Sequence, residues 1–283
     1  MSPVTAPALP IGPMMTMYDP IFVGIDEMRQ PVYMPLIYRN ILAAGEPGGG
    51  KSGLIQCIAC HAALCDRTRL ILLDGKQVEL GMLAQAADKF VGPDIDDAIL
   101  TLRRLQRVMD NRYSWLTARR RRKIDQYDDV NVIVVIIDEI AYFSATVGDE
   151  RQQREFIALL RDLVARGRAA GIIVVAATQR PSVDIIPKSM RDLFGYRAAF
   201  RCTSSGSSDI ILGDGWSGSG YCATDILPTS LGVCYLIAEG GTPRKIKVAY
   251  LTDSDIAHIA DYAVAIRRNG RNGSPLSTHQ LAA

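Results

Sequence analysis

The sequence predicts an α/β protein with a mainly parallel central sheet flanked by helices. Three observations predict this fold class: several apolar runs have the length of buried strands, segments of helical periodicity alternate with them, and a glycine-rich loop joins one strand to one helix. The chain has 283 residues, and 48% of them are hydrophobic. This length and composition suffice for a sizeable core in one large domain.

The local patterns give the order of the expected elements. Residues 130–137 are apolar except for one asparagine and are rich in β-branched side chains, which is typical of a central parallel strand. Between residues 98 and 123, apolar side chains such as Ile99, Leu102 and Leu105 recur at helical spacing. Strands are expected at residues 21–25, 31–34, 36–44, 69–74, 130–139, 171–178 and 196–202. Helices are expected at residues 53–64, 98–123 and 154–168.

The glycine-rich loop fits the P-loop pattern G-x-x-x-x-G-K-[ST] at every fixed position. It reads Gly45-Glu46-Pro47-Gly48-Gly49-Gly50-Lys51-Ser52 and is followed by Gly53. Glycines let the backbone fold around an anion with its N–H groups exposed, and the helix that follows adds the positive end of its dipole. We expect Lys51 to reach the β- and γ-phosphates of ATP and the Ser52 hydroxyl to bind Mg²⁺.

Acidic and amide side chains follow two of the other expected strands. Asp138 and Glu139 come directly after the strongest apolar run, and Gln179 follows the strand at residues 171–178. The carboxyl ends of parallel strands meet at one edge of a sheet, so all three should lie near the P-loop. We expect Asp138 to hold Mg²⁺, Glu139 to orient and deprotonate the attacking water, and Gln179 to sense the γ-phosphate or the water.

Composition excludes several other classes of protein. The chain has no apolar stretch of about 18 residues that could form a transmembrane helix, and its N-terminus lacks the pattern of a secretory signal. His61, His258 and His279 do not have the spacing of a metal site. The net charge is +2, so any DNA contact has to come from local basic patches.

Several motifs together resemble one family. They are the P-loop and residues 73–80, 137–139, 165–171, 177–184 and 197–205. In this order, over about residues 20–255, they resemble the FtsK/SpoIIIE-type DNA translocases. The resemblance implies a RecA-like P-loop NTPase fold, ATP hydrolysis with Mg²⁺, and a homo-hexameric ring that pumps double-stranded DNA through its pore.

The resemblance also implies an arginine that acts in the active site of a neighbouring subunit. Arg168 matches that position, Arg166 is the near alternative, and Arg197 and Arg201 are weaker candidates. A cation there would stabilise charge on the γ-phosphoryl oxygens. The basic run at residues 119–123 could grip DNA phosphates, although a solvated helix end is the favoured interpretation.

The expected domain organisation is simple. Residues 1–19 are expected to form a flexible lead, residues 20–265 an FtsK-like ATPase domain, and residues 266–283 a disordered polar tail. The family's membrane helices and DNA-reading winged-helix module are not found in the sequence. This absence favours a cytoplasmic protein that resembles compact transfer proteins of actinobacterial plasmids and integrating conjugative elements. Recruitment to the membrane by an anchoring or DNA-loading partner stays open.

Three functions compete at this point. The leading hypothesis is an ATP-driven translocase of double-stranded DNA in conjugative transfer or chromosome partition. The second is a protein-secretion ATPase, because FtsK-like domains also power bacterial secretion. The third is a scaffold that binds ATP without hydrolysing it, and Glu139 argues against it.

Overall fold

The computed structural model describes residues 15–65 and 67–270 and has one ten-stranded mixed sheet at its centre. The strand order is β2-β1-β10-β9-β8-β3-β7-β6-β4-β5. Strands β8, β3, β7, β6, β4 and β5 are parallel, while β2, β1, β10 and β9 extend the sheet with antiparallel pairs. The predicted α/β class with a mainly parallel sheet is therefore confirmed.

The strands are β1 (Ile21–Asp26), β2 (Pro31–Met34), β3 (Ile41–Ala44), β4 (Thr68–Leu73), β5 (Lys89–Val91), β6 (Val132–Ile137), β7 (Ile172–Thr178), β8 (Tyr196–Phe200), β9 (Val233–Ala238) and β10 (Arg244–Val248). The α-helices are α1 (Lys51–Leu64), α2 (Ile95–Ala118), α3 (Glu150–Arg166), α4 (Lys188–Arg191), α5 (Ser205–Leu212) and α6 (Asp253–Gly270). Short turns of 3₁₀- or π-helix are η1 (Gly81–Ala86), η2 (Tyr142–Thr146), η3 (Gly167–Ala170), η4 (Ser217–Ser219) and η5 (Ala223–Asp225).

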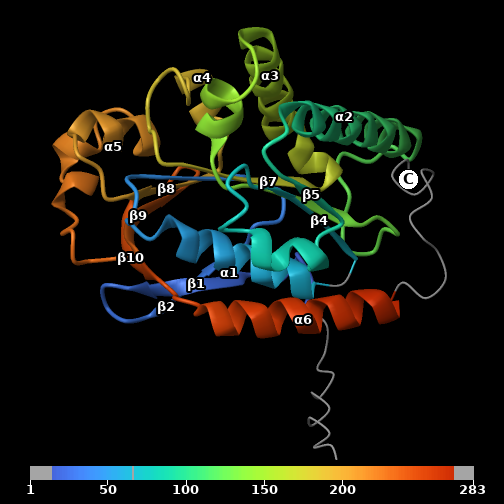
Figure 1. Ribbon diagram of the computed structural model, residues 1–283, viewed down its shortest axis with the longest axis horizontal. Helices are drawn as coiled ribbons and strands as arrows, with labels where there is room; N and C mark the ends of the chain where they lie inside the picture. The colour runs from blue at the N-terminus through green and yellow to red at the C-terminus, as the bar shows by residue number, and fades with distance from the viewer. Residues whose placement is uncertain (1–14, 66, 271–283) are drawn as a thin grey trace, which may run out of the picture.

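Helices cover both faces of the sheet, and each face has its own apolar core. Figure 1 shows α1 and α6 on one side of the sheet and α2, α3 and α5 on the other. Residues of α1, such as Ile58, pack with Val134 and other side chains on the first face. Residues of α2 and α3, such as Leu102 and Leu160, pack with Val135 on the second. The uniformly buried β6 and β7 therefore face helices on both sides, as their continuous apolar sequences predict.

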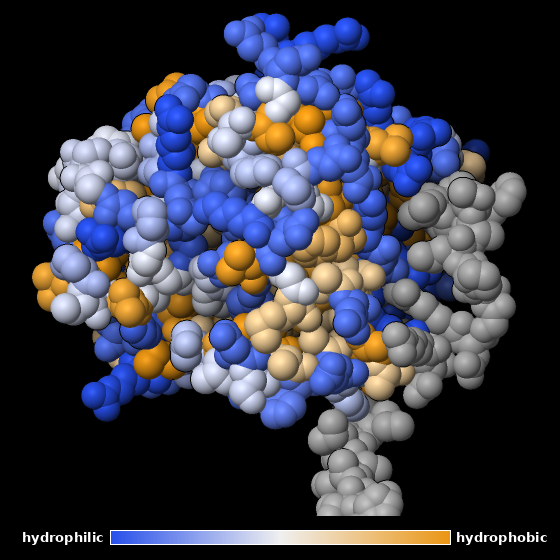
Figure 2. All heavy atoms as spheres, in the orientation of Figure 1, coloured by the Kyte–Doolittle hydropathy of each residue, from blue (hydrophilic) through white to orange (hydrophobic). Residues whose placement is uncertain are grey.

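One face of the surface carries both polar and apolar side chains. Figure 2 shows mostly hydrophilic side chains on the face turned to the viewer, with hydrophobic ones gathered in its lower central part, where Figure 1 places η1.

Among the described residues, no helix is both long enough and apolar enough to cross a bilayer. None of the described histidine, cysteine and acidic side chains form a cluster that could hold a metal ion by themselves.

Helix boundaries differ from the predictions because caps and tertiary contacts set them. Helix α2 starts at Ile95, where the Asp94 side chain accepts hydrogen bonds from two backbone N–H groups, and it ends at Ala118 instead of residue 123. Helix α3 starts at Glu150 with a capping box between Asp149 and Gln152. The basic run at residues 119–123 thus follows a helix and is not part of one.

The predicted domain boundaries also need correction. Met17, expected in the flexible lead, is buried in the core beside α1. Helix α6 continues to Gly270, so residues 266–270 are helical where a disordered tail was predicted. The Arg267 guanidinium holds this end of the helix by donating to the carbonyl oxygens of Ala63 and Thr68, each at 3.0 Å. The rest of the predicted lead and tail, residues 1–14 and 271–283, lies outside the described residues.

The parallel strands create two chemically different edges. We call the edge where β3, β6, β7 and β8 end the carboxyl edge, and the opposite edge, where they begin, the amino edge. The P-loop follows β3 at the carboxyl edge, and the Gly45 N–H there donates to the Thr178 carbonyl at 3.4 Å. Arg168 in η3 precedes β7 and lies at the amino edge.

Candidate nucleotide-binding site

At Gly48 and Gly50 the P-loop backbone needs glycine for different reasons. Gly50 has φ +93°, and a Cβ there would lie 2.4 Å from the Gly232 nitrogen, so both conformation and space exclude a side chain. Gly48 has φ +74° but faces open space. The left-handed backbone at Gly48 and Gly50 bends the loop, and α1 starts directly after it at Lys51. This is the arrangement in which backbone N–H groups and a helix dipole bind phosphate.

Lys51 is folded back onto its own loop. Its Nζ donates to the carbonyl oxygens of Gly45 and Glu46, at 2.7 Å each, and the residue is 7% exposed. Burial lowers the pKa of Lys51 to about 8, and the nearby carboxylates of Glu139 and Asp138 oppose this shift. A phosphate in the loop would give the ammonium a better partner than two neutral carbonyls.

Asp138 and Glu139 follow β6 at the same edge and have different surroundings. One oxygen of Asp138, Oδ2, is buried and lacks a hydrogen-bond partner among the described residues. Burial raises the pKa of Asp138 to about 7, with further contributions from the carboxylates of Asp74, Glu79 and Glu139. A buried carboxylate without a donor partner is suited to a cation.

Glu139 is held by three donors. Its Oε1 accepts from the Thr178 hydroxyl at 2.6 Å and from the Ala141 N–H at 3.1 Å, and its Oε2 accepts from the Gln179 N–H at 2.8 Å. These bonds fix the carboxylate at the carboxyl edge of the sheet, where β7 lies between β6 and β3. Gln179 contributes its backbone here, and its side chain is half-buried. The role of the Thr178 hydroxyl was missed from the sequence, although its place at the end of β7 was the available signal.

Two further interactions shape the edge. The Arg201 guanidinium forms an ion pair with Glu46 at 2.9 Å, and the Glu46 N–H donates to the Arg201 carbonyl at the same distance. Arg201, a weaker candidate for a role in a neighbouring subunit, thus binds the chain's own P-loop. Asp74 is fully buried and accepts from the N–H groups of residues 76, 77 and 80, so it shapes the loop after β4.

The oxygen donors of this site suit a magnesium ion. Ser52 lies at the first turn of α1, half-buried, and Asp138 presents its unpartnered oxygen from the end of β6. Hydroxyl, carboxylate and water oxygens are the ligands that Mg²⁺ takes together with nucleotide phosphates. These two residues could hold the ion, with waters and the nucleotide completing its shell.

The two arginines proposed to act on a neighbour lie away from this site. Arg168 precedes β7, and Thr178 is the last of the seven residues of that strand, which spans about 20 Å. The Arg168 Nε donates to the Tyr38 carbonyl at 2.6 Å, and its Nη2 pairs with Glu239 at 3.1 Å. Arg166 is paired with both Asp162 and Asp110. Arg168 has fewer ion-pair partners than Arg166, which favours Arg168 as the residue that can reach outward.

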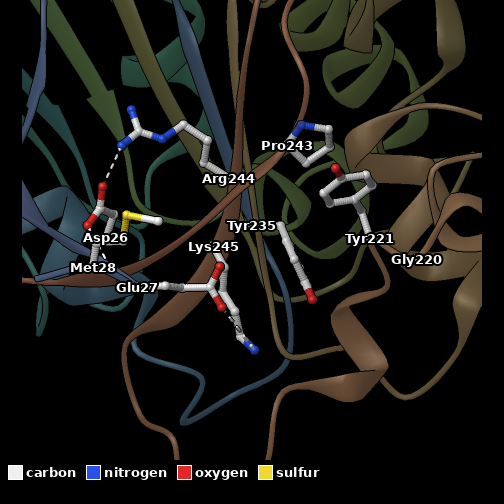
Figure 3. A pocket seen from close by; sticks show the side chains of 9 residues that line it. All are labelled: Asp26, Glu27, Met28, Gly220, Tyr221, Tyr235, Pro243, Arg244 and Lys245. Atoms are coloured by element: carbon white, nitrogen blue, oxygen red, sulfur yellow. Dashed lines mark hydrogen bonds and ion pairs between the residues drawn. The ribbon is translucent and has the colours of Figure 1, made fainter. Parts of the chain in front are cut away.

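A second cavity is chemically different. Figure 3 shows it beside β10, with Tyr221 and Tyr235 on one side and the turn after β1 on the other; its volume is about 400 Å³. Its four charged side chains form the pairs Arg244–Asp26 at 2.9 Å and Lys245–Glu27 at 3.9 Å. Because these charges cancel, the cavity does not suit a polyphosphate.

Comparison with known proteins agrees with this geometry. The sequence profile of the FtsK/SpoIIIE family matches residues 13–132. The DNA translocase FtsK of Treponema pallidum (strain Nichols) is 30% identical over 259 residues, which cover 85% of this chain and 31% of that protein. The chain is similar to the FtsK/SpoIIIE family in both comparisons. The DNA translocase FtsK of Chlorobaculum tepidum is 28% identical over 243 residues, covering 79% of this chain and 29% of that protein. This chain therefore spans less than a third of the length of these curated relatives.

Solved structures support the fold of this chain. The pCW3 conjugation coupling protein TcpA, solved as a monomer with ATPγS, has a TM-score of 0.75 at 21% identity and covers 90% of this chain and 75% of its own. EssC (ATPases 2 and 3) from Geobacillus thermodenitrificans has a TM-score of 0.71 at 15% identity and covers 97% of this chain and 53% of its own. The predicted P-loop NTPase fold is confirmed by these likenesses.

Proposed function

We propose that this chain is an ATP-driven translocase of double-stranded DNA that works as a ring of identical subunits. The observation that carries the ATPase part is Glu139, fixed by Thr178 and Gln179 at the edge that holds the P-loop. The DNA part rests on the similarity to DNA translocases over most of the chain. Plasmid transfer or chromosome partition in the cytoplasm, with anchoring or DNA-loading partners, is the setting that we propose.

The proposed chemistry follows from the residues in place. The P-loop N–H groups and Lys51 bind the phosphates of ATP, and Lys51 exchanges its two carbonyl partners for them. Glu139 accepts a proton from the attacking water, because its hydrogen bonds with Thr178 and Gln179 fix the orientation of its carboxylate. Bound Mg²⁺, held by Ser52 and Asp138, would neutralise charge on the phosphates. Arg168 of a neighbouring subunit would stabilise the charge that develops on the γ-phosphoryl oxygens.

The experiment is ATP hydrolysis by the purified chain, with and without linear double-stranded DNA, for the wild type and for Glu139→Gln. We expect Glu139→Gln to lower kcat by about 100-fold while ATP still binds, since only the proton acceptor is lost. Glu150→Gln is the matched control, because Glu150 is exposed at the start of α3 and should not change the rate.

The DNA arm separates the translocase from the competing functions. We expect DNA to raise the wild-type rate several-fold and a triplex-forming strand to be displaced from linear DNA while ATP is hydrolysed. A rate of ATP hydrolysis that DNA of any length leaves unchanged would contradict the translocase proposal and favour the secretion ATPase. No hydrolysis at all would favour a scaffold that only binds nucleotide.

A further inference from the structure

The amino edge carries an open cavity that the chemistry above leaves unassigned. Its volume is about 650 Å³, and it lies between Arg168 with Ala169 on one side and residues 120–123 on the other. Residues 120–123 are Arg-Arg-Arg-Lys, so the cavity brings together cations from two distant parts of the chain. The run that the sequence suggested as a solvated helix end is instead one wall of a cavity.

Most of the positive charge in this cavity is uncompensated. Arg121 is paired with Asp125 and Asp128. By contrast, Arg120 and Arg122 are exposed and have no ion-pair partner among the described residues. The Lys123 ammonium lies 4.1 Å from the centroid of the Tyr38 ring, and the residue is exposed.

Tyr38 connects the two walls. Its carbonyl accepts from Arg168 Nε at 2.6 Å, its hydroxyl donates to the Ile124 carbonyl at 2.6 Å, and its ring lies against Lys123. Tyr38 has φ +60° and Arg120 has φ +55°, a left-handed conformation that is strained for residues with a Cβ. Such strain persists only where the surroundings fix it, and it is concentrated at binding sites.

Other groups anchor the basic wall firmly. Ile124 is fully buried, its N–H donates to the Ala169 carbonyl at 3.0 Å, and Gly171 has no side chain that would displace it. The buried Arg112 donates to the Ala170 carbonyl at 2.7 Å and supports the same segment from below. The cations are therefore held by a rigid backbone and do not depend on a free helix end.

We propose that this cavity binds the triphosphate end of a nucleotide held in the P-loop of a second copy of the chain. The inference rests on the proposed function and extends it, because it adds Arg122, Lys123 and Arg120 to Arg168. The chain's own P-loop is excluded, since it lies at the other end of β7. Carboxylates of Glu239, Asp125 and Asp128 flank the cations and confine the positive surface to a compact patch. A compact polyphosphate suits such a patch better than an extended DNA backbone, which needs a continuous basic groove.

The test is self-association driven by ATPγS, measured by analytical ultracentrifugation on the full chain. Arg122→Gln/Lys123→Gln should weaken this association about tenfold and lower kcat at saturating ATP by about tenfold or more. The affinity of the dilute variant for ATPγS should stay within about twofold of wild type, because its P-loop is intact; this also shows that it is folded. Arg104→Gln/Arg107→Gln removes two exposed arginines of α2 outside the cavity and should behave as wild type.

Mixing experiments locate the action between subunits. An equal mixture of Lys51→Ala and Arg122→Gln/Lys123→Gln should hydrolyse ATP faster than either variant alone, since the first supplies an intact cavity and the second an intact P-loop. The conservative variant Arg122→Lys/Lys123→Arg should keep most of the activity, because it keeps the charge.

Three results would overturn the inference. If the cavity variant matches the α2 control in association and in rate while Arg168→Ala is inactive, the cavity is not part of the site, and the proposed function survives. If neither the cavity variant nor Arg168→Ala changes association or rate, both proposals about the amino edge fail. If the variant instead loses affinity for a labelled DNA duplex without nucleotide, while association is unchanged, the cavity binds DNA phosphates.

Discussion

At the scale of single residues, Glu139 shows how one hydroxyl can position a carboxylate. Thr178 is fully buried, and its Oγ1 lies 2.6 Å from Glu139 Oε1. The same hydroxyl accepts from the Arg180 N–H at 3.1 Å, so it connects Glu139 with the segment that carries Gln179. These hydrogen bonds of the Thr178 side chain do not involve the P-loop. Thr178 is therefore a positioning residue for the proposed water activation.

Replacing Thr178 by valine should separate positioning from nucleotide binding. Thr178→Val keeps the shape but removes the donor, and we expect kcat to fall about tenfold, which corresponds to about 1.4 kcal/mol. The ATP dissociation constant should stay within about twofold, because the P-loop is untouched. Thr178→Ser restores the hydroxyl and should recover most of the rate. Steady-state hydrolysis and equilibrium ATP binding measure the two effects, and an unchanged kcat in the valine variant would refute the role.

At the scale of elements, Gly171 sets how the start of β7 meets the basic wall. It ends η3 with φ +68°, and a Cβ there would lie 2.1 Å from Ile124 Cδ1. We expect Gly171→Ala to lower the free energy of unfolding by about 2 kcal/mol or more, since it combines backbone strain with a steric clash in the core. Gly81→Ala is the matched control, because its Cβ meets nothing within 4 Å, and it should change stability by less than about 0.5 kcal/mol.

Urea unfolding of both glycine variants measures this difference. The midpoint should move to lower urea for Gly171→Ala with a similar slope, because the surface exposed on unfolding hardly changes. Equal midpoints for the two variants would mean that the segment at residues 120–124 shifts easily. In that case the basic wall is not rigid, and its cations are not held in a fixed position at the cavity.

The elements also explain which features could be predicted from the sequence. The buried strands β6 and β7 were predicted because an apolar, β-branched run is a local signal. The end of α2 was placed five residues too late, because arginine and lysine favour helices and no glycine or proline follows Ala118. The break comes from distant contacts, namely the ion pairs of Arg121 and the insertion of Ile124 against Gly171.

The same contrast holds in the candidate site. The P-loop, Asp138 and Glu139 were recognised from local motifs, and the parallel sheet brings them to one edge. The hydrogen bond from Thr178 to Glu139 and the ion pair between Arg201 and Glu46 join residues far apart in the chain. Nothing in either local sequence specifies the partner, so such contacts appear only once the strand order is known.

At the scale of the whole molecule, the two edges of the sheet are complementary. The carboxyl edge holds the carboxylates of Asp138 and Glu139 and would hold a nucleotide, while the amino edge holds Arg168 and the cations of residues 120–123. An interface that joins one edge to the opposite edge of the next copy is heterologous, and such interfaces close into rings when the rotation allows. This arrangement supports the proposal that one copy completes the site of another.

If a second copy completes the active site, the rate of ATP hydrolysis per chain should depend on the chain concentration. We expect the hydrolysis rate per chain to rise steeply with concentration and then to level off, because a lone subunit lacks the cation that stabilises the γ-phosphoryl charge. Arg168→Ala should stay at the low rate throughout, since the variant lacks the guanidinium that would leave Glu239 to reach a neighbour. Hydrolysis at serial dilutions, with sedimentation at the same concentrations, measures this. A rate per chain that is constant while the chain remains monomeric would mean that each subunit hydrolyses ATP alone, and the opposed edges would then need another explanation.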